Sequence, residues 1–144
     1  MARYSAGGLT GAGSTTLPVI ALYAGATGAP ILKGFRIWNT TAVAVDFELV
    51  RVTTAGTWTS TTEAAWRDRA AANVSQCFIT ASGTPPTIGT RLGLFYSLAG
   101  AIGTGIMETL EDGIHIPTGV ANGVALVPLG TGQAIRATFI WEDE

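Results

Sequence analysis

The fold of this chain is decided by residues 43–50, Val-Ala-Val-Asp-Phe-Glu-Leu-Val, in which large apolar side chains alternate with small or polar ones. The large apolar side chains occupy every second position, at Val43, Val45, Phe47 and Leu49. A period of two places them on one face of a β-strand, whereas a helix repeats its apolar positions about every 3.6 residues. The segment therefore predicts a strand with one face in a core.

The sequence on either side extends this pattern into two predicted hairpins. Residues 31–38 form another apolar run, and Asn39-Thr40-Thr41 between the two runs supplies turn residues. Near the C-terminus, residues 123–129 and 133–141 flank Gly130-Thr131-Gly132 in the same way. Shorter strands are predicted at 18–23, 74–80, 91–98, 105–110 and 114–116.

These segments give the chain the pattern of an all-β protein. Strands that recur about every 8–12 residues between Gly, Pro and Thr turns are typical of sandwiches and jelly rolls. We expect an antiparallel β-sandwich, jelly-roll-like, as a single domain over residues 17–144. Residues 62–72 begin with a capping residue and contain good helix formers, so they form either a short helix or an ordered loop.

The N-terminal segment, residues 1–16, differs from the rest because it consists mostly of Gly, Ser, Thr and Ala. Such a segment has too few apolar side chains to order itself, which predicts a flexible extended arm. Either a neighbouring subunit holds this arm or the edge of a sheet accepts it as an added strand.

The composition describes an almost neutral surface. Charged residues make up 12% of the chain, against about 25% in an average domain. The sequence contains 22 alanines, 19 glycines and 21 threonines, and its mean hydropathy is +0.37. Because the centres of protein interfaces are depleted in Lys, Glu and Asp, this composition favours a protein held in an assembly. We expect a homo-oligomer, with a trimer favoured.

Nucleic acids and membranes are not expected as partners. The net charge is −2, so the chain has no broad basic field that would attract phosphates. Its uncharged runs, within residues 5–32 and 92–107, are interrupted by glycines, and the first also by prolines. A transmembrane helix needs about 20 consecutive apolar residues, and the longest apolar stretch is far shorter.

Catalytic and cofactor sites are not indicated. Cys77, the only cysteine, has the surroundings of a buried strand and is far in sequence from His115, the only histidine. Residues 100–105 are glycine-rich but have the order G-x-x-G-x-G with no lysine after them, which indicates a turn and not a phosphate loop. We therefore expect no enzyme activity and no cofactor.

One cluster has the spacing of a metal site on a helix. Its members are Glu108, Glu111, Asp112 and His115. Glycine and proline interrupt such a helix, and residues 114–116, Ile-His-Ile, alternate like a strand with the histidine exposed. We therefore expect no metal site.

Four tryptophans raise the alternative of a carbohydrate-binding β-sandwich module. Aromatic rings can stack on sugars, and the candidates are Trp38, Trp58, Trp66 and Trp141. Two of them, Trp38 and Trp141, lie within strand patterns, and few amides or carboxylates accompany Trp58. This module remains the alternative to a structural protein.

Three parts of the sequence resemble small β-sandwich structural proteins of tailed bacteriophages. They are the opening Met-Ala-Arg-Tyr with its Gly/Ser/Thr arm, residues 35–57 (FRIWNTTAVAVDFELVRVTTAGT) and residues 116–144 (IPTGVANGVALVPLGTGQAIRATFIWEDE). The most similar family is the capsid decoration proteins. The resemblance implies a non-enzymatic protein that is made in the host cytoplasm and lies on the outer surface of the virion capsid, where it bridges major capsid protein subunits. A small tail or head–tail structural protein is the alternative within the virion.

The contacts with such partners are expected from the arm and from arginines, which are enriched at interfaces. The charges are also uneven: residues 1–100 hold seven basic and four acidic groups, whereas 101–144 hold one basic and six acidic groups. This asymmetry indicates two differently charged faces, or an accidental scatter of few charges. The candidate partner-binding residues are Arg3, Tyr4, Leu9, Arg67, Arg69 and Arg91.

Overall fold

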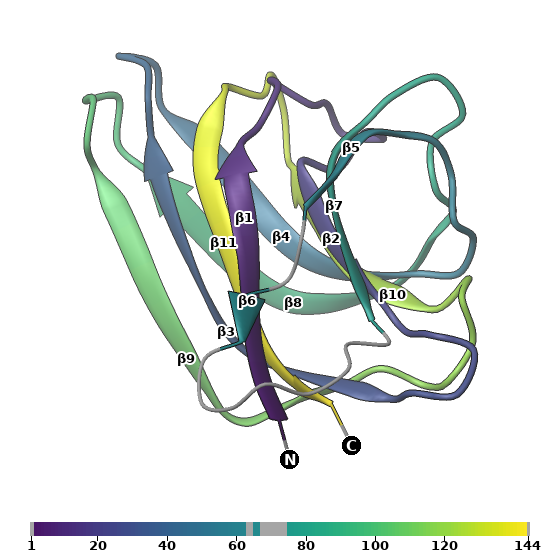
Figure 1. The fold of residues 1–144 in the computed structure, drawn as a ribbon. Coiled ribbons are helices and arrows are strands. Elements are labelled where there is room, and N and C mark those ends of the chain that lie inside the picture. Colours follow the sequence, from purple (N-terminus) through teal and green to yellow (C-terminus); the bar gives the residue numbers. More distant parts are fainter. Residues whose placement is uncertain (1, 63–64, 67–74, 144) are drawn as a thin grey trace.

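The computed structural model describes residues 2–62, 65–66 and 75–143, which form two antiparallel β-sheets packed face to face (Figure 1). Sheet A contains, in spatial order, β6 (Ala65–Trp66), β1 (Ala2–Leu9), β11 (Ile135–Asp143), β3 (Pro30–Asn39) and β9 (Gly105–His115). Sheet B contains β5 (Trp58–Thr62), β7 (Gln76–Ala81), β2 (Ile20–Tyr23), β10 (Gly123–Pro128), β4 (Val45–Val52) and β8 (Ile88–Leu98).

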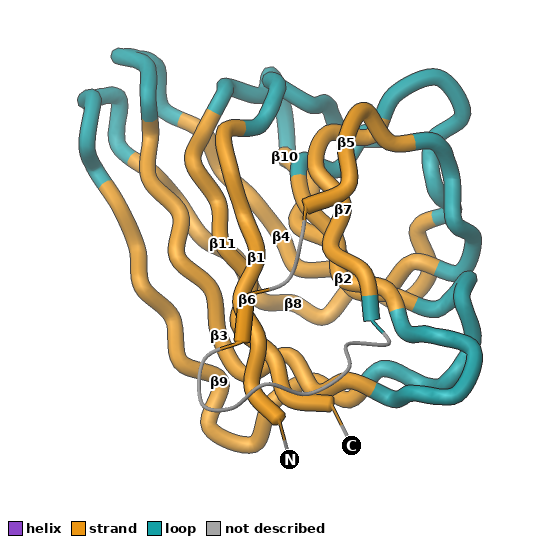
Figure 2. The backbone as a smooth tube through the Cα atoms, in the orientation of Figure 1, coloured by secondary structure: helices purple, strands orange, loops and turns teal. Residues whose placement is uncertain are grey.

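Strands dominate the described chain, and the loops that connect them lie at the periphery (Figure 2). None of the described residues is helical. Accordingly, no helix that could cross a membrane occurs among them. The predicted all-β class is confirmed.

The strand order is that of a jelly roll. Sheet A contains the row β1-β11-β3-β9, and sheet B contains the row β2-β10-β4-β8. Along these eight strands the chain changes sheet at every connection except that from β4 to β8. Strands β5, β6 and β7 are inserted at this connection, where β7 pairs with β2 and β6 pairs with β1. The predicted antiparallel, jelly-roll-like sandwich is therefore confirmed.

Both predicted hairpins are wrong, because β3 and β4 lie in opposite sheets, as do β10 and β11. The turn after β3 is built on Asn39, whose buried amide donates to the carbonyl oxygens of Val43 at 2.7 Å and Ala99 at 3.1 Å. In the turn before β11, a Cβ at Gly132 would collide with the carbonyl oxygen of Ala12. Turn residues mark a reversal of the chain, but they do not specify whether it returns in the same sheet.

The strands predicted at 105–110 and 114–116 are one strand, β9. Its register with β3 shifts between Leu32 and Gly34, and Gly113 has a φ of +73°. A Cβ at Gly113 would collide with the side chain of Ile31. This glycine allows pairing to continue through an irregularity at which the sequence alternation breaks.

The segment predicted as a helix or loop, residues 62–72, lies mostly outside the described residues. Its described parts are extended: Thr62 ends β5, and Ala65–Trp66 is strand β6.

The N-terminal segment is not a flexible arm: residues 2–9 form strand β1 of sheet A, in agreement with the alternative that a sheet accepts the segment as an added strand. β1 pairs with β11 in unbroken register from Ala2↔Asp143 to Leu9↔Arg136, so the two ends of the chain lie side by side (Figure 1). The backbone N–H of Thr10 then donates to the carbonyl oxygen of Ile135 at 2.8 Å. Main-chain hydrogen bonds hold this segment, and they do not depend on its small side chains. The sandwich therefore includes residues that the sequence assigned to the arm.

The core lies between the two sheets and is rich in aromatic side chains. Tyr4 and Trp141 are cross-strand partners, both are fully buried, and their rings stack with centroids 5.9 Å apart. Phe35 of sheet A meets Tyr96 of sheet B edge to face, with centroids 4.7 Å apart. Cys77 is buried in β7, as predicted.

Candidate functional site

The outer face of sheet A carries a group of exposed side chains that the strand register brings together. Leu9, Arg136 and Trp38 are successive cross-strand neighbours on β1, β11 and β3. In the next row, Arg36 of β3 lies beside Met107 of β9. All five side chains are exposed. We call these five residues the Trp38 patch.

The apolar members of the Trp38 patch are large and unusually open to solvent. The exposed fractions are 54% for Leu9, 40% for Trp38 and 69% for Met107. A shallow hollow of about 460 Å³ lies against Trp38, Met107 and Arg36. Gly105, the cross-strand neighbour of Trp38, also lines it, and the missing side chain helps to keep it open. Hollows between exposed apolar side chains are common where partners or ligands dock, which makes this one a candidate docking site.

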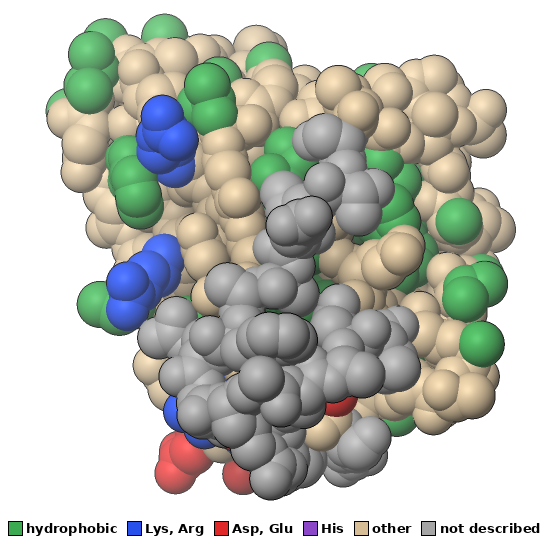
Figure 3. Space-filling model, viewed as in Figure 1, with side chains coloured by type: hydrophobic (Ala, Val, Ile, Leu, Met, Phe, Trp, Pro, Cys, Tyr) green, Lys and Arg blue, Asp and Glu red, His purple; other side chains and the backbone are tan. Residues whose placement is uncertain are grey.

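The basic members of the patch are Arg36 and Arg136, which are not neutralised by any carboxylate among the described residues. The ion pairs among the described residues are Arg3–Glu142 and Arg91–Glu48, so neither Arg36 nor Arg136 has a carboxylate partner there. Figure 3 shows basic side chains among hydrophobic ones on the part of this face formed by β3, β9 and β11.

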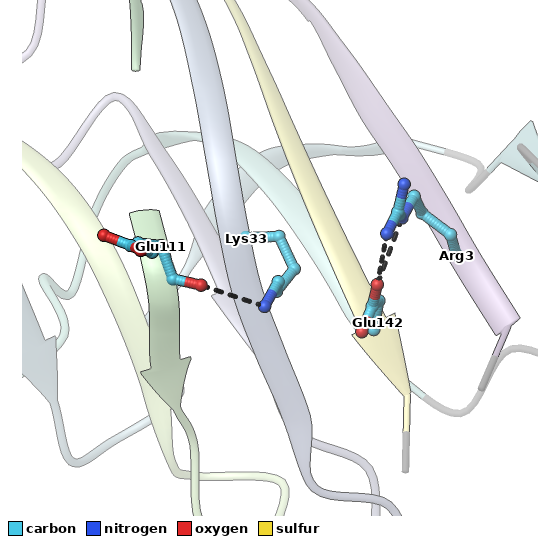
Figure 4. A network of polar contacts seen from close by, with 4 residues as sticks. All are labelled: Arg3, Lys33, Glu111 and Glu142. Atoms are coloured by element: carbon cyan, nitrogen blue, oxygen red, sulfur yellow. Dashed lines mark hydrogen bonds and ion pairs between the residues drawn. The ribbon is translucent and has the colours of Figure 1, made fainter. Parts of the chain in front are cut away.

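The opposite end of the same face has its charges arranged differently (Figure 4). Arg3 donates two hydrogen bonds to the carboxylate of Glu142, and Lys33 Nζ lies 3.5 Å from the carbonyl oxygen of Glu111, to which it donates. Basic groups at this end therefore have partners within the chain, which distinguishes it from the Trp38 patch.

The residues predicted as partner contacts do not come together where the structure describes them, which is at Arg3, Tyr4, Leu9 and Arg91. Leu9 is in the Trp38 patch, whereas Arg3 pairs with Glu142 on the same face but at the other end. Tyr4 is fully buried, so its ring packs in the core and is not accessible to a partner. This corrects the assignment of Tyr4 as a partner contact. The interpretation of the N-terminal segment as an arm did not anticipate that Tyr4 lies in a strand of the sandwich.

Of the three arginines predicted outside the arm, the structure describes Arg91, which is separate from the patch. Arg91 lies on β8 at the edge of sheet B, where it donates to Glu48 at 2.7 Å. Arg67 and Arg69 lie outside the described residues.

The sequence did not single out Arg36, Met107 or Arg136 as contact residues, and it indicated Trp38 only as a candidate sugar-stacking ring, although part of the signal was present. Arg36 and Trp38 are two positions apart on a strand and alternate with Phe35 and Ile37, which predicts a shared outward face. Their proximity to Met107 and Arg136 depends on β3 lying between β11 and β9, a pairing that the hairpin interpretation excluded.

The cluster around His115 lies on a strand and not on the helix that its spacing would require. Its four members lie on strand β9, where no group of three His, Cys, Asp or Glu among the described residues is placed to hold a metal ion. His115 is exposed and Ile116 is buried, as expected from the strand alternation. Glu108 lies near Tyr96: burial raises the pKa of Tyr96 to about 12, and the charge of Glu108 adds to this rise.

The tryptophans fall into different environments. Trp141 is in the core, and Trp58 is half-buried, stacks on Phe78 with centroids 5.9 Å apart and donates from Nε1 to the carbonyl oxygen of Ala55 at 2.7 Å. The side chain of Trp66 is outside the described part. Trp38 is therefore the exposed tryptophan among those the structure describes.

No protein family model, curated protein or solved structure matches this chain. The jelly-roll topology, the Trp38 patch and the resemblance of the sequence therefore carry the functional argument.

Proposed function

We propose that this chain is a non-enzymatic structural protein of a bacteriophage virion, which binds the outer surface of the capsid as a decoration protein and bridges major capsid protein subunits. The observation that carries this proposal is the Trp38 patch, a cluster of exposed Trp, Met, Leu and Arg on a chain with only 12% charged residues. Interface centres are enriched in Trp, Met and Arg. The jelly roll is a recurrent architecture of viral capsid proteins, and the sequence resembles decoration proteins.

The strands make the Trp38 patch a rigid contact surface. Its side chains project from β1, β11, β3 and β9, whose pairing has no register shift at the patch positions. A surface that is already ordered loses little conformational entropy on binding. On a symmetric shell, the same modest contact is repeated many times, and linked contacts multiply a weak affinity. A homotrimer would present three such patches together.

The location is tested by mass spectrometry and electron cryomicroscopy of purified virions of the phage proposed to encode the chain. The chain is expected in many copies in the head fraction, with sandwich-shaped density on the outside of the capsid. Recovery in the tail fraction would replace the decoration role by the tail or head–tail alternative. Absence from virions would overturn the proposal.

The oligomeric state is tested by light scattering of the purified chain. A trimer has the mass of three 14.8 kDa chains, whereas a monodisperse 14.8 kDa species at micromolar concentration would contradict self-association.

A carbohydrate-binding module is the second candidate, and the exposed ring of Trp38 beside two arginines favours it. Jelly rolls also occur in lectins, and a sugar site needs polar groups around its stacking ring. A glycan array separates the two functions: a sugar ligand whose binding is lost in Trp38→Ala would support the module.

A further inference from the structure

We propose that the Trp38 patch binds an acidic, partly apolar segment of its partner, in which two carboxylates pair with Arg36 and Arg136 and an apolar side chain enters the hollow beside Trp38. The identity of the partner as a shell protein rests on the proposed function. The chemistry of the segment rests on the patch itself.

The spacing of the two arginines defines the arrangement of the carboxylates. Arg36 is the cross-strand partner of Thr138, and Arg136 lies two positions away on β11, so the arginines are diagonal neighbours on one face. Diagonal neighbours on adjacent strands are about 7–8 Å apart. In an extended segment, residues i and i+2 point to the same side and lie about 6.5–7 Å apart. Two acidic residues separated by one residue therefore match the arginine pair.

The apolar side chains of the patch indicate that a ligand needs an apolar group in addition to negative charge. Trp38 lies directly beside Arg136, and Met107 lies directly beside Arg36. Both are largely open to solvent, and the hollow lies against them. A small inorganic anion would neutralise the arginines but would leave these surfaces wet. The fitting ligand therefore combines carboxylates with an apolar side chain, as a polypeptide segment does.

A second copy of this chain fits the patch less well. Among the described acidic residues, four have hydrogen-bonding partners: Asp46, Glu48, Glu142 and Asp143. The exposed pair at the end of β9, Glu111 and Asp112, is adjacent in sequence and does not have the alternate spacing that the arginines require. Glu108, the remaining described acidic residue, is only partly exposed and lies near Tyr96. Among the described residues, the charge complementarity therefore favours a different chain.

Charge reversal tests the role of the arginines. Purified shells stripped of the chain are incubated with the wild-type protein or with the double variant Arg36→Glu/Arg136→Glu, and the bound fraction is measured by sedimentation. We expect the double variant to lose binding, and each single change to alanine to weaken it by about 10–100-fold. The matched control is Lys33→Glu, the same charge change on the same face outside the patch, which we expect to stay within about threefold of wild type.

Both arginine side chains are exposed, so the variants are expected to fold, and unchanged urea midpoints would verify this. If the wild type binds shells and the double variant binds equally well, the inference is overturned while the proposed function stands. If the wild type does not bind shells, the proposed function fails first. If charge reversal dissociates an oligomer of the chain and leaves shell binding unchanged, the patch is a self-interface, which also overturns the inference.

Chemical modification of the shells tests the partner. Converting shell carboxylates to neutral amides with a carbodiimide and an amine is expected to abolish binding of the wild-type chain. Acetylating shell lysines is the matched control and is expected to preserve binding. Retention after carboxylate neutralisation, or equal loss after both treatments, would contradict a carboxylate-specific contact.

Discussion

The outer faces of the two sheets differ in what covers them. On sheet B, the outward residues of β2, β4 and β10 form a second buried cluster, against which Trp58 and Phe78 pack. The chain itself closes this cluster, because the hydroxyl of Tyr23 donates to the carbonyl oxygens of Thr54 and Ala55 in the loop after β4. On sheet A, the Trp38 patch has no comparable cover, and its large side chains are open to solvent.

The charged side chains of the two faces also differ in whether the chain itself provides their partners. Glu48 on sheet B is only 3% exposed and is paired with Arg91. Arg36 and Arg136 on sheet A have no carboxylate partner among the described residues. Around β2, β4 and β10 the face of sheet B is therefore completed within the chain, although Phe95 of β8, the cross-strand partner of Glu48, is 63% exposed. The Trp38 patch on sheet A is suited to a contact with another molecule. This difference predicts that substitutions on sheet B reduce stability, whereas those in the Trp38 patch reduce binding.

The largest difference in the free energy of unfolding is expected between two substitutions of aromatic residues. Tyr23→Ala removes a buried ring from the sheet B cluster and should lower the free energy of unfolding by about 3–5 kcal/mol. Trp38→Ala should change it by less than about 1 kcal/mol, because that side chain is exposed. Urea denaturation measures both values. Equal losses would show that the sheet A face is also part of the stabilising core.

A smaller difference in the free energy of unfolding is expected among substitutions of arginines. Arg91→Ala leaves the buried carboxylate of Glu48 without its partner and should lower the free energy of unfolding by about 1–2 kcal/mol, since half of the arginine side chain is solvent-exposed. Arg36→Ala should stay within about 0.5 kcal/mol of wild type. Arg3→Ala, which breaks a more exposed ion pair, serves as the intermediate control. An Arg36 effect as large as that of Arg91 would contradict the assignment of Arg36 to a binding surface.

The hydroxyl of Tyr23 contributes less than its ring. Tyr23→Phe leaves the ring packing but removes the donor to two loop carbonyl oxygens, which should lower the free energy of unfolding by about 1 kcal/mol. Hydrogen exchange should also speed up in the loop after β4. An unchanged loop would mean that packing alone closes the sheet B cluster.

Alkaline pH should reduce stability through two tyrosines, the buried Tyr23 and the half-buried Tyr96. Burial raises the pKa of both Tyr23 and Tyr96 to about 12, from about 10 in the unfolded chain. The folded state therefore keeps phenol protons that the unfolded state releases, so stability is complete below pH 10 and is lost as the pH rises through 12. Urea midpoints measured from pH 9 to 12 should fall, and less steeply in Tyr23→Phe and Tyr96→Phe. Identical slopes in wild type and variants would contradict this origin.

The strand pattern shows how much of the site is visible in the sequence. Alternation at 35–38 correctly separates the buried Phe35 and Ile37 from the exposed Arg36 and Trp38. The same logic places Cys77 in the core. It does not place Met107 beside Arg36, because these residues belong to strands that are 65 or more positions apart along the chain and meet only through sheet pairing.

Residues 2–9 illustrate why the N-terminus was harder to interpret. Their side chains are small apart from Arg3, Tyr4 and Leu9, so composition alone describes an arm. Pairing with β11 orders them through main-chain groups that every residue shares. Composition describes only the side chains, so it does not show stabilisation by main-chain hydrogen bonds.

The amino-acid sequence by itself determined that most of the chain forms strands, which side chains face inward where the alternation is regular, as at 35–38 and 45–49, and that its surface carries little charge. These properties are local, because they follow from alternation and composition. Only the tertiary structure decided which strands are neighbours, that consecutive strands separate into two sheets, and that Leu9, Arg36, Trp38, Met107 and Arg136 share one surface. The physical reason is that hydrogen bonding between strands is nearly independent of side-chain identity, so partners are selected by the packing of the whole core.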